Sequence, residues 1–138
     1  MATAKPMILV ADDYPAMLRL ISRVLEVEGY RVVTASDGDG VLKLVSENKP
    51  LALVVLGIDD VELPSTEICC RLRQLSDVPV IILSGRRKES DAVNALNAGA
   101  DEYIRKPFTI EEFVARVKAV LRHNELATNL VESPRAAG

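Results

Sequence analysis

The apolar run at residues 51–56 (LALVVL), which ends at Gly57, constrains the fold more than any other stretch of the chain. Six consecutive apolar residues leave no polar side chain for a solvated face, so the run predicts a strand in a sheet covered by helices on both sides. Two adjacent acids, Asp59 and Asp60, follow shortly afterwards. Ligands of open α/β sheets gather at the carboxyl ends of the strands, so functional chemistry is expected just beyond this run.

Strand-like and helical patterns alternate along the rest of the chain. Strands are predicted at residues 7–11, 31–35, 51–56, 78–83 and 102–105. Apolar residues at helical spacing lie between and after them, including a helix expected at residues 41–48 after a turn at 36–40. A fivefold βα alternation predicts an α/β protein with a doubly wound, parallel five-stranded sheet.

Length and composition favour one domain of a soluble protein. The 138 residues are enough for one hydrophobic core, and 49% are hydrophobic and 27% charged. We expect a domain at residues 5–123, followed by a polar tail or linker stub at residues 124–138. A net charge of −3 argues against direct nucleic-acid binding, and no apolar run approaches the ~18 residues of a membrane span. Cys69 and Cys70 are adjacent and poorly placed to bridge, which favours a reduced, cytoplasmic protein.

Polar residues follow four of the predicted strands and should meet at one edge of the sheet. They are Asp12 with Asp13, Asp59 with Asp60, Ser84, and Lys106. Paired carboxylates suit Mg²⁺, which prefers oxygen ligands. A hydroxyl and an ammonium group suit the oxygens of a phosphoryl group, whose transfer depends mainly on positioning and charge neutralisation. The set therefore indicates phosphoryl chemistry, but it lacks an obvious acceptor.

Three segments resemble the receiver domain of two-component response regulators, and the resemblance covers residues 6–123. They are ILVADDYPAMLRLISRVLEVEGYRVVTASDG, CRLRQLSDVPVIILSGR and AGADEYIRKPFTIEEFVARVKAVLR. The last two look most like receivers of regulators with a winged-helix DNA-binding output. The resemblance implies a flavodoxin-like fold, cytoplasmic phosphorelay signalling, Mg²⁺ as cofactor, and no catalytic turnover of a separate substrate. The chain is then either a stand-alone receiver or a fragment of a longer regulator.

The resemblance also assigns roles to single residues. Asp12 and Asp13 correspond to the metal-binding acidic pair. Ser84 corresponds to the switch hydroxyl and Tyr103 to the switch aromatic residue. Lys106 corresponds to the lysine that contacts the phosphoryl group, and its bond to Pro107 is typically cis in this family.

The phosphoacceptor position is where the chain departs from the family, and two alignments compete. An ungapped alignment of both flanks places Gly57 there, 44 residues after Asp13 and 27 before Ser84. The local match of DVELP to the family's Asp-x-x-x-Pro instead favours Asp60, with Asp59 as a further alternative. The first alignment predicts a degenerate receiver that works through protein–protein contacts, because glycine cannot be phosphorylated and removes one metal ligand. The second predicts a working phospho-switch with Mg²⁺.

The resemblance implies a sensor histidine kinase or another signalling protein as partner. A homodimer through the fourth helix, fifth strand and fifth helix is a further option. Asp101, Glu112 and Arg116 match charged positions of that face, although the basic residue expected near Ala92 is missing.

A haloacid-dehalogenase-like phosphohydrolase is a remote alternative. That family requires Asp-x-Asp, whereas Tyr14 stands two residues after Asp12.

Overall fold

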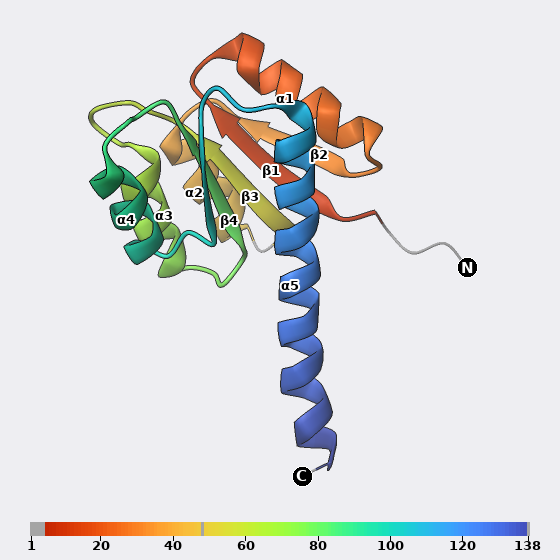
Figure 1. The fold of residues 1–138 in the computed structure, drawn as a ribbon. Helices are drawn as coiled ribbons and strands as arrows, with labels where there is room; N and C mark the ends of the chain where they lie inside the picture. Colours follow the sequence, from red (N-terminus) through yellow and green to blue (C-terminus); the bar gives the residue numbers. More distant parts are fainter. Residues whose placement is uncertain (1–4, 48, 138) are drawn as a thin grey trace.

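The computed structural model describes the backbone of residues 5–47 and 49–137, and side chains as far as residue 125. Its strands are β1 (Met7–Asp12), β2 (Arg31–Ala35), β3 (Leu51–Gly57), β4 (Val80–Ser84) and β5 (Glu102–Arg105). Its helices are α1 (Pro15–Val27), α2 (Gly38–Ser46), α3 (Ser65–Arg73), α4 (Glu89–Asn97) and α5 (Ile110–Ala137). The strands form one parallel sheet in the order β2-β1-β3-β4-β5, with α1 and α5 on one face and the other three helices on the opposite face (Figure 1). The predicted doubly wound (βα)5 fold is confirmed.

Alternate residues of the central strands point into two separate cores. In β3, Leu53 and Val55 pack with α1 and α5, whereas Val54 and Leu56 pack with α2, α3 and α4. All four side chains are fully buried. A strand with both faces buried needs apolar residues at every position, which explains the uninterrupted run.

Helix α2 begins three residues earlier than predicted. Asp37 caps it by accepting a hydrogen bond from the Gly40 N–H at 2.8 Å, so the expected turn at residues 36–40 contains the first helical turn. The helix ends at Ser46 rather than at Asn48, which lies outside the described residues.

Helix α5 continues past the expected end of the domain. It runs as a single helix to Ala137, and its C-terminal part extends away from the sheet (Figure 1). The division at residue 123 into a domain and a tail stays a prediction. Among the described residues, no helix combines the length and the apolar character needed to span a membrane.

Arg73, the last residue of α3, connects this helix to the loops that precede β4 and β5. Its guanidinium donates hydrogen bonds to the Gly99 carbonyl at 2.8 and 3.1 Å, to the carbonyls of Ser76 and Val78, and to Asp101 at 3.0 Å. Asp101 in turn accepts the N–H of Val80 at 2.8 Å. These bonds pair carbonyls of the loops that lead into β4 and β5, so Arg73 fixes how the two strands enter the sheet.

Replacing Arg73 with Met is expected to lower the free energy of unfolding by about 2–4 kcal/mol, because several half-buried acceptors lose a charged donor. Urea denaturation measures the change. Arg71→Met is the matched control in the same helical turn, because in the described part of the chain Arg71 makes only an exposed pair with Glu67; we expect a loss below about 0.5 kcal/mol. Equal losses in the two variants would contradict the role given to Arg73.

Candidate functional site

The candidate site lies at the carboxyl edge of the sheet, where four strands end side by side. Asp12, Gly57 and Ser84 are the last residues of β1, β3 and β4, and Lys106 directly follows β5. Asp12 is paired in register with Gly57, and Ser84 with Arg105. The structure therefore places the sequence-predicted polar residues along one edge, with a glycine at its centre.

The carboxylate of Asp12 fills the space that a side chain at Gly57 would need. A Cβ atom built on Gly57 would collide with Oδ2 of Asp12. Asp12 is only 1% exposed. Its Oδ1 accepts the N–H of Tyr14 at 2.8 Å, and its Oδ2 lies 3.4 Å from Nζ of Lys106. The Lys106–Pro107 peptide bond is cis.

Burial dominates the electrostatics of Asp12. It raises the pKa of the carboxyl group above its ordinary value, because the charged form is deprived of water. The hydrogen bond from Tyr14 and the nearby charge of Lys106 act in the opposite direction and offset part of the effect. Asp12 and Lys106 therefore form a largely buried ion pair at the centre of the site.

The loop after β3 is anchored by Ser65, which was not among the predicted site residues. The Ser65 hydroxyl donates to the Ile58 carbonyl at 2.8 Å and accepts the Ile58 N–H at 2.9 Å. The Ser65 N–H adds a third bond to the same carbonyl at 2.9 Å. These contacts close the loop at its base and hold Asp59 at the sheet edge.

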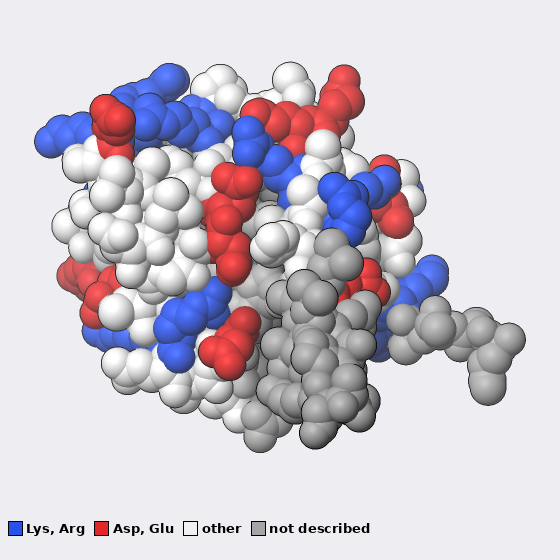
Figure 2. Space-filling view, turned by 60° about the horizontal axis from the view of Figure 1, so that its bottom comes forward, with Lys and Arg blue, Asp and Glu red and all other residues white. Residues whose placement is uncertain are grey.

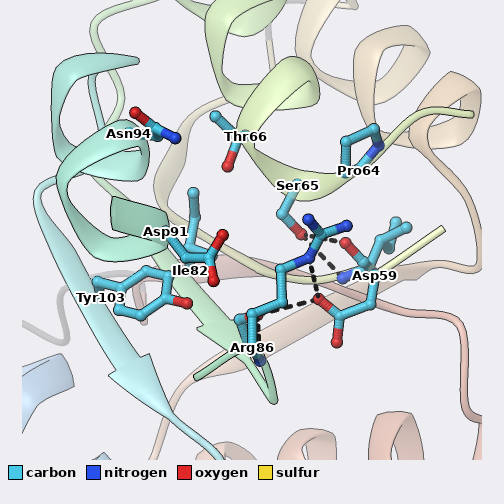
Figure 3. Close-up of a pocket in the computed structure, with 11 residues that line it drawn as sticks. Asp59, Pro64, Ser65, Thr66, Ile82, Arg86, Asp91, Asn94 and Tyr103 are labelled. Carbon is cyan, nitrogen blue, oxygen red and sulfur yellow. Dashed lines mark hydrogen bonds and ion pairs between the residues drawn. The ribbon is translucent and has the colours of Figure 1, made fainter. Parts of the chain in front are cut away.

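Asp59 lies against the hydroxyl of Ser84. That hydroxyl donates to Oδ1 of Asp59 at 3.1 Å and accepts the N–H of Arg86 at 3.1 Å (Figure 3). The Arg86 side chain lies over the same carboxylate, with Nε 3.9 Å from Oδ1. Arg86 is the second site residue that the sequence did not reveal: its position near Ser84 was visible, but the direction of its side chain was not.

The two other acids of the site, Asp13 and Asp60, make fewer contacts with Ser84 and Lys106. The Asp59 N–H donates to Oδ2 of Asp13 at 3.3 Å, and the exposed Asp60 accepts the N–H of Glu62 at 3.1 Å. Within the described part of the chain, no three His, Cys, Asp or Glu side chains are grouped so that they could hold a metal ion. One oxygen of Asp12 is also occupied by Lys106. Receiver domains typically bind Mg²⁺, and a metal ion here would have to compete with Lys106 for that oxygen of Asp12.

Charged residues of the expected dimer face are already paired within the chain. Arg116 donates to Glu102 at 2.9 Å and to Glu112 at 3.4 Å. Asp101 is held by Arg73 at 3.0 Å. A dimer that used these charges would share them with the internal pairs.

Comparison with known proteins agrees with the fold. The sequence pattern of the response regulator receiver domain matches residues 8–118. The transcriptional regulatory protein KdpE of Mycobacterium tuberculosis is 42% identical over 125 residues, which are 90% of this chain and 54% of KdpE. The alkaline phosphatase synthesis transcriptional regulatory protein PhoP of Bacillus subtilis is 43% identical over 121 residues, 87% of this chain and 50% of PhoP. The chain thus spans about half the length of these relatives.

A solved structure gives the same result. The CheY-like response regulator receiver domain protein of Methanospirillum hungatei superposes with a TM-score of 0.84 at 29% identity, covering 90% of this chain and 99% of that one. The resemblance expected from the three sequence segments is confirmed: the chain belongs to the receiver domains of two-component response regulators.

Proposed function

We propose that this receiver domain signals without phosphorylation of an aspartate at the usual acceptor position, acting in the cytoplasm through contacts with other signalling proteins. The observation that carries the proposal is Gly57 at the end of β3, with Asp12 in the space beside it. A glycine has no group that can accept a phosphoryl, and the buried Asp12 is held away from solvent by its pairing with Lys106.

Both groups that would contact a phosphoryl group in a typical receiver already have partners. Lys106 faces Asp12, and Ser84 donates to Asp59. The carboxylate of Asp59 thus offers Ser84 a negatively charged acceptor, which is the role we assign to the phosphoryl group in the phosphorylated family members. We infer a domain held in one arrangement of the switch residues, with no catalytic turnover of a separate substrate.

A phospho-switch that uses a displaced acid is the second candidate function. The contact between Asp59 and Ser84 favours Asp59 over Asp60 in this reading, because Asp60 is exposed and bonded only within its own loop. Phosphorylation of Asp59 would require it to release both Ser84 and Arg86. It would also require Asp12 to leave Lys106 for Mg²⁺, so two sets of contacts oppose it.

The relatives suggest the kind of pathway. Two of them are transcriptional regulatory proteins of about twice this chain's matched length, so we propose a partner in transcriptional control, with a sensor histidine kinase as a further candidate. The face of α4, β5 and α5 remains a candidate contact surface. Its internally paired charges favour a different protein over a second copy of this chain, and the domain's acidic charge argues against direct contact with nucleic acid.

The wild-type chain treated with acetyl phosphate and Mg²⁺ is expected to show no phosphoryl adduct by intact-mass spectrometry. Gly57→Asp is expected to gain one, because the group that its Cβ meets is the end of a short side chain that can rotate. Once Asp12 has rotated, the substitution would place a third carboxylate beside Asp12 and Asp13. Three carboxylates form an oxygen-rich set that suits Mg²⁺.

Gly57→Asn is the matched control, since it adds a side chain of the same size that cannot accept a phosphoryl group in this way. A stoichiometric adduct on the wild-type chain would contradict the proposal. If peptide mapping placed that adduct on Asp59 or Asp60, it would support the displaced phospho-switch instead.

The pH dependence of Asp12 tests the buried ion pair. A carboxyl group whose pKa is raised by folding binds its proton more tightly in the native state, so this group's contribution to stability should rise as the pH falls through that pKa. Carbon-detected NMR of the Asp12 carboxyl should show a midpoint above 3.8. Lys106→Met should move it higher still, because the charge that opposes the shift is lost. A wild-type midpoint at or below the ordinary value would contradict the assignment.

A further inference from the structure

A cavity of about 140 Å³ opens beside the switch residues, between the loop after β3, the end of β4, α4 and β5 (Figure 3). Its volume is similar to the ~150 Å³ of an engineered protein cavity that binds benzene. Unlike such an apolar cavity, this one is lined by hydroxyl, amide and charged groups as well as by apolar side chains.

Several of these polar groups have no partner. The hydroxyl oxygen of Tyr103 is buried without a hydrogen bond, and Figure 3 shows it pointing into the cavity. The side chains of Thr66 and Asn94 also line the cavity, and neither makes a hydrogen bond in the described part of the chain. A buried polar group is destabilising unless it is hydrogen-bonded, so the Tyr103 oxygen favours an occupant that can bond to it. Thr66 is partly exposed and Asn94 exposed, so both can turn toward the same occupant without a penalty for burial.

The charges of the lining favour a cation. The two carboxylates, Asp59 and Asp91, each use one oxygen: Oδ1 of Asp59 contacts Ser84 and Arg86, and Oδ2 of Asp91 accepts the N–H of Lys88 at 3.1 Å. Their other oxygens have no bond in the described part of the chain. The only counter-charge lining the cavity is Arg86, whose side chain is 48% exposed and held to Asp59 at 3.9 Å.

We infer that this cavity binds a small organic cation of the amidine or guanidine type. The guanidinium of Arg86 lies against Asp59, with Nε 3.9 Å from Oδ1 (Figure 3), so a planar cation of the same chemistry already contacts one of the two carboxylates. A free ligand would take the place of Arg86 against Asp59, and it would direct further N–H groups at Asp91 and the oxygen of Tyr103. Charge-assisted bonds of this kind are among the stronger ones in proteins.

Such a ligand would lie against Ser84 and Tyr103, the two residues that typically move in receivers. The bound cation would therefore set the positions of Ser84 and Tyr103 without a phosphoryl group. This regulatory role rests on the proposed function, whereas binding of the cation does not.

Benzamidine and the smaller methylguanidine are suitable probes, with the neutral benzamide and methylurea as their matched controls. In nitrogen–proton NMR spectra of the whole chain, each cation at millimolar concentration should shift the amide signals of Thr66, Asp91 and Tyr103 in a saturable way. Asp91→Asn keeps the side chain's size and its bond to Lys88 but removes the charge, and it should weaken binding about tenfold. Tyr103→Phe, which removes only the hydroxyl, should also weaken binding.

Absence of saturable shifts with both cations would overturn the inference. So would equal binding of the cations and their neutral controls, or unchanged affinity in Asp91→Asn. The experiment contains no phosphoryl donor. A negative binding result therefore leaves the adduct measurements on the wild-type chain and the Gly57 variants unaffected. An adduct on the wild-type chain would likewise leave the binding result to stand by itself.

Discussion

Two opposite charges at the carboxyl edge of the sheet, on Asp12 and Lys106, have to neutralise each other. Asp12 is 1% exposed and the Lys106 side chain 16%, so neither charge is well solvated. A buried charge is costly unless it is paired. A typical receiver resolves this problem with a metal ion and a third carboxylate at the acceptor position. If Gly57 occupies that position, as we propose, no carboxylate is present there, and the space beside Gly57 is filled by Asp12, which lies against the lysine.

The rest of the edge follows from this arrangement. With no acceptor side chain at the end of β3, the next acid in the loop, Asp59, provides the negative charge that Ser84 contacts. Ser65 holds the base of the loop so that this contact is maintained, and Arg86 covers the carboxylate. The Ser84 hydroxyl is thereby bonded to a carboxylate of the same chain, which suits the proposed role of presenting one surface to a partner rather than two alternating surfaces.

The fold could be predicted because its signals are local. Both faces of β3 are buried, so an unbroken apolar run identified it, and the ends of the strands located the functional edge. Contacts at that edge could not be predicted, because they join side chains from different elements. The bond between Ser84 and Asp59 links residues 25 positions apart. The orientation of the Asp12 carboxylate depends on Gly57, which has no side chain and lies beside Asp12 on the neighbouring strand β3. The start of α2 was predicted too late, although Asp37 was a recognisable helix cap.

We propose that the carboxyl edge of the sheet is already neutralised and does not respond to a phosphoryl group. Beryllofluoride with Mg²⁺ mimics a phosphoryl group on a receiver aspartate, and its effect on the amide signals of the wild-type chain tests this claim most directly. An edge that is already neutralised should leave the signals of Ser84, Tyr103 and Lys106 unchanged at saturating beryllofluoride. A saturable shift of these three signals would show that an acid elsewhere at the edge, such as Asp59 or Asp60, accepts the mimic, and it would contradict a permanently neutralised edge.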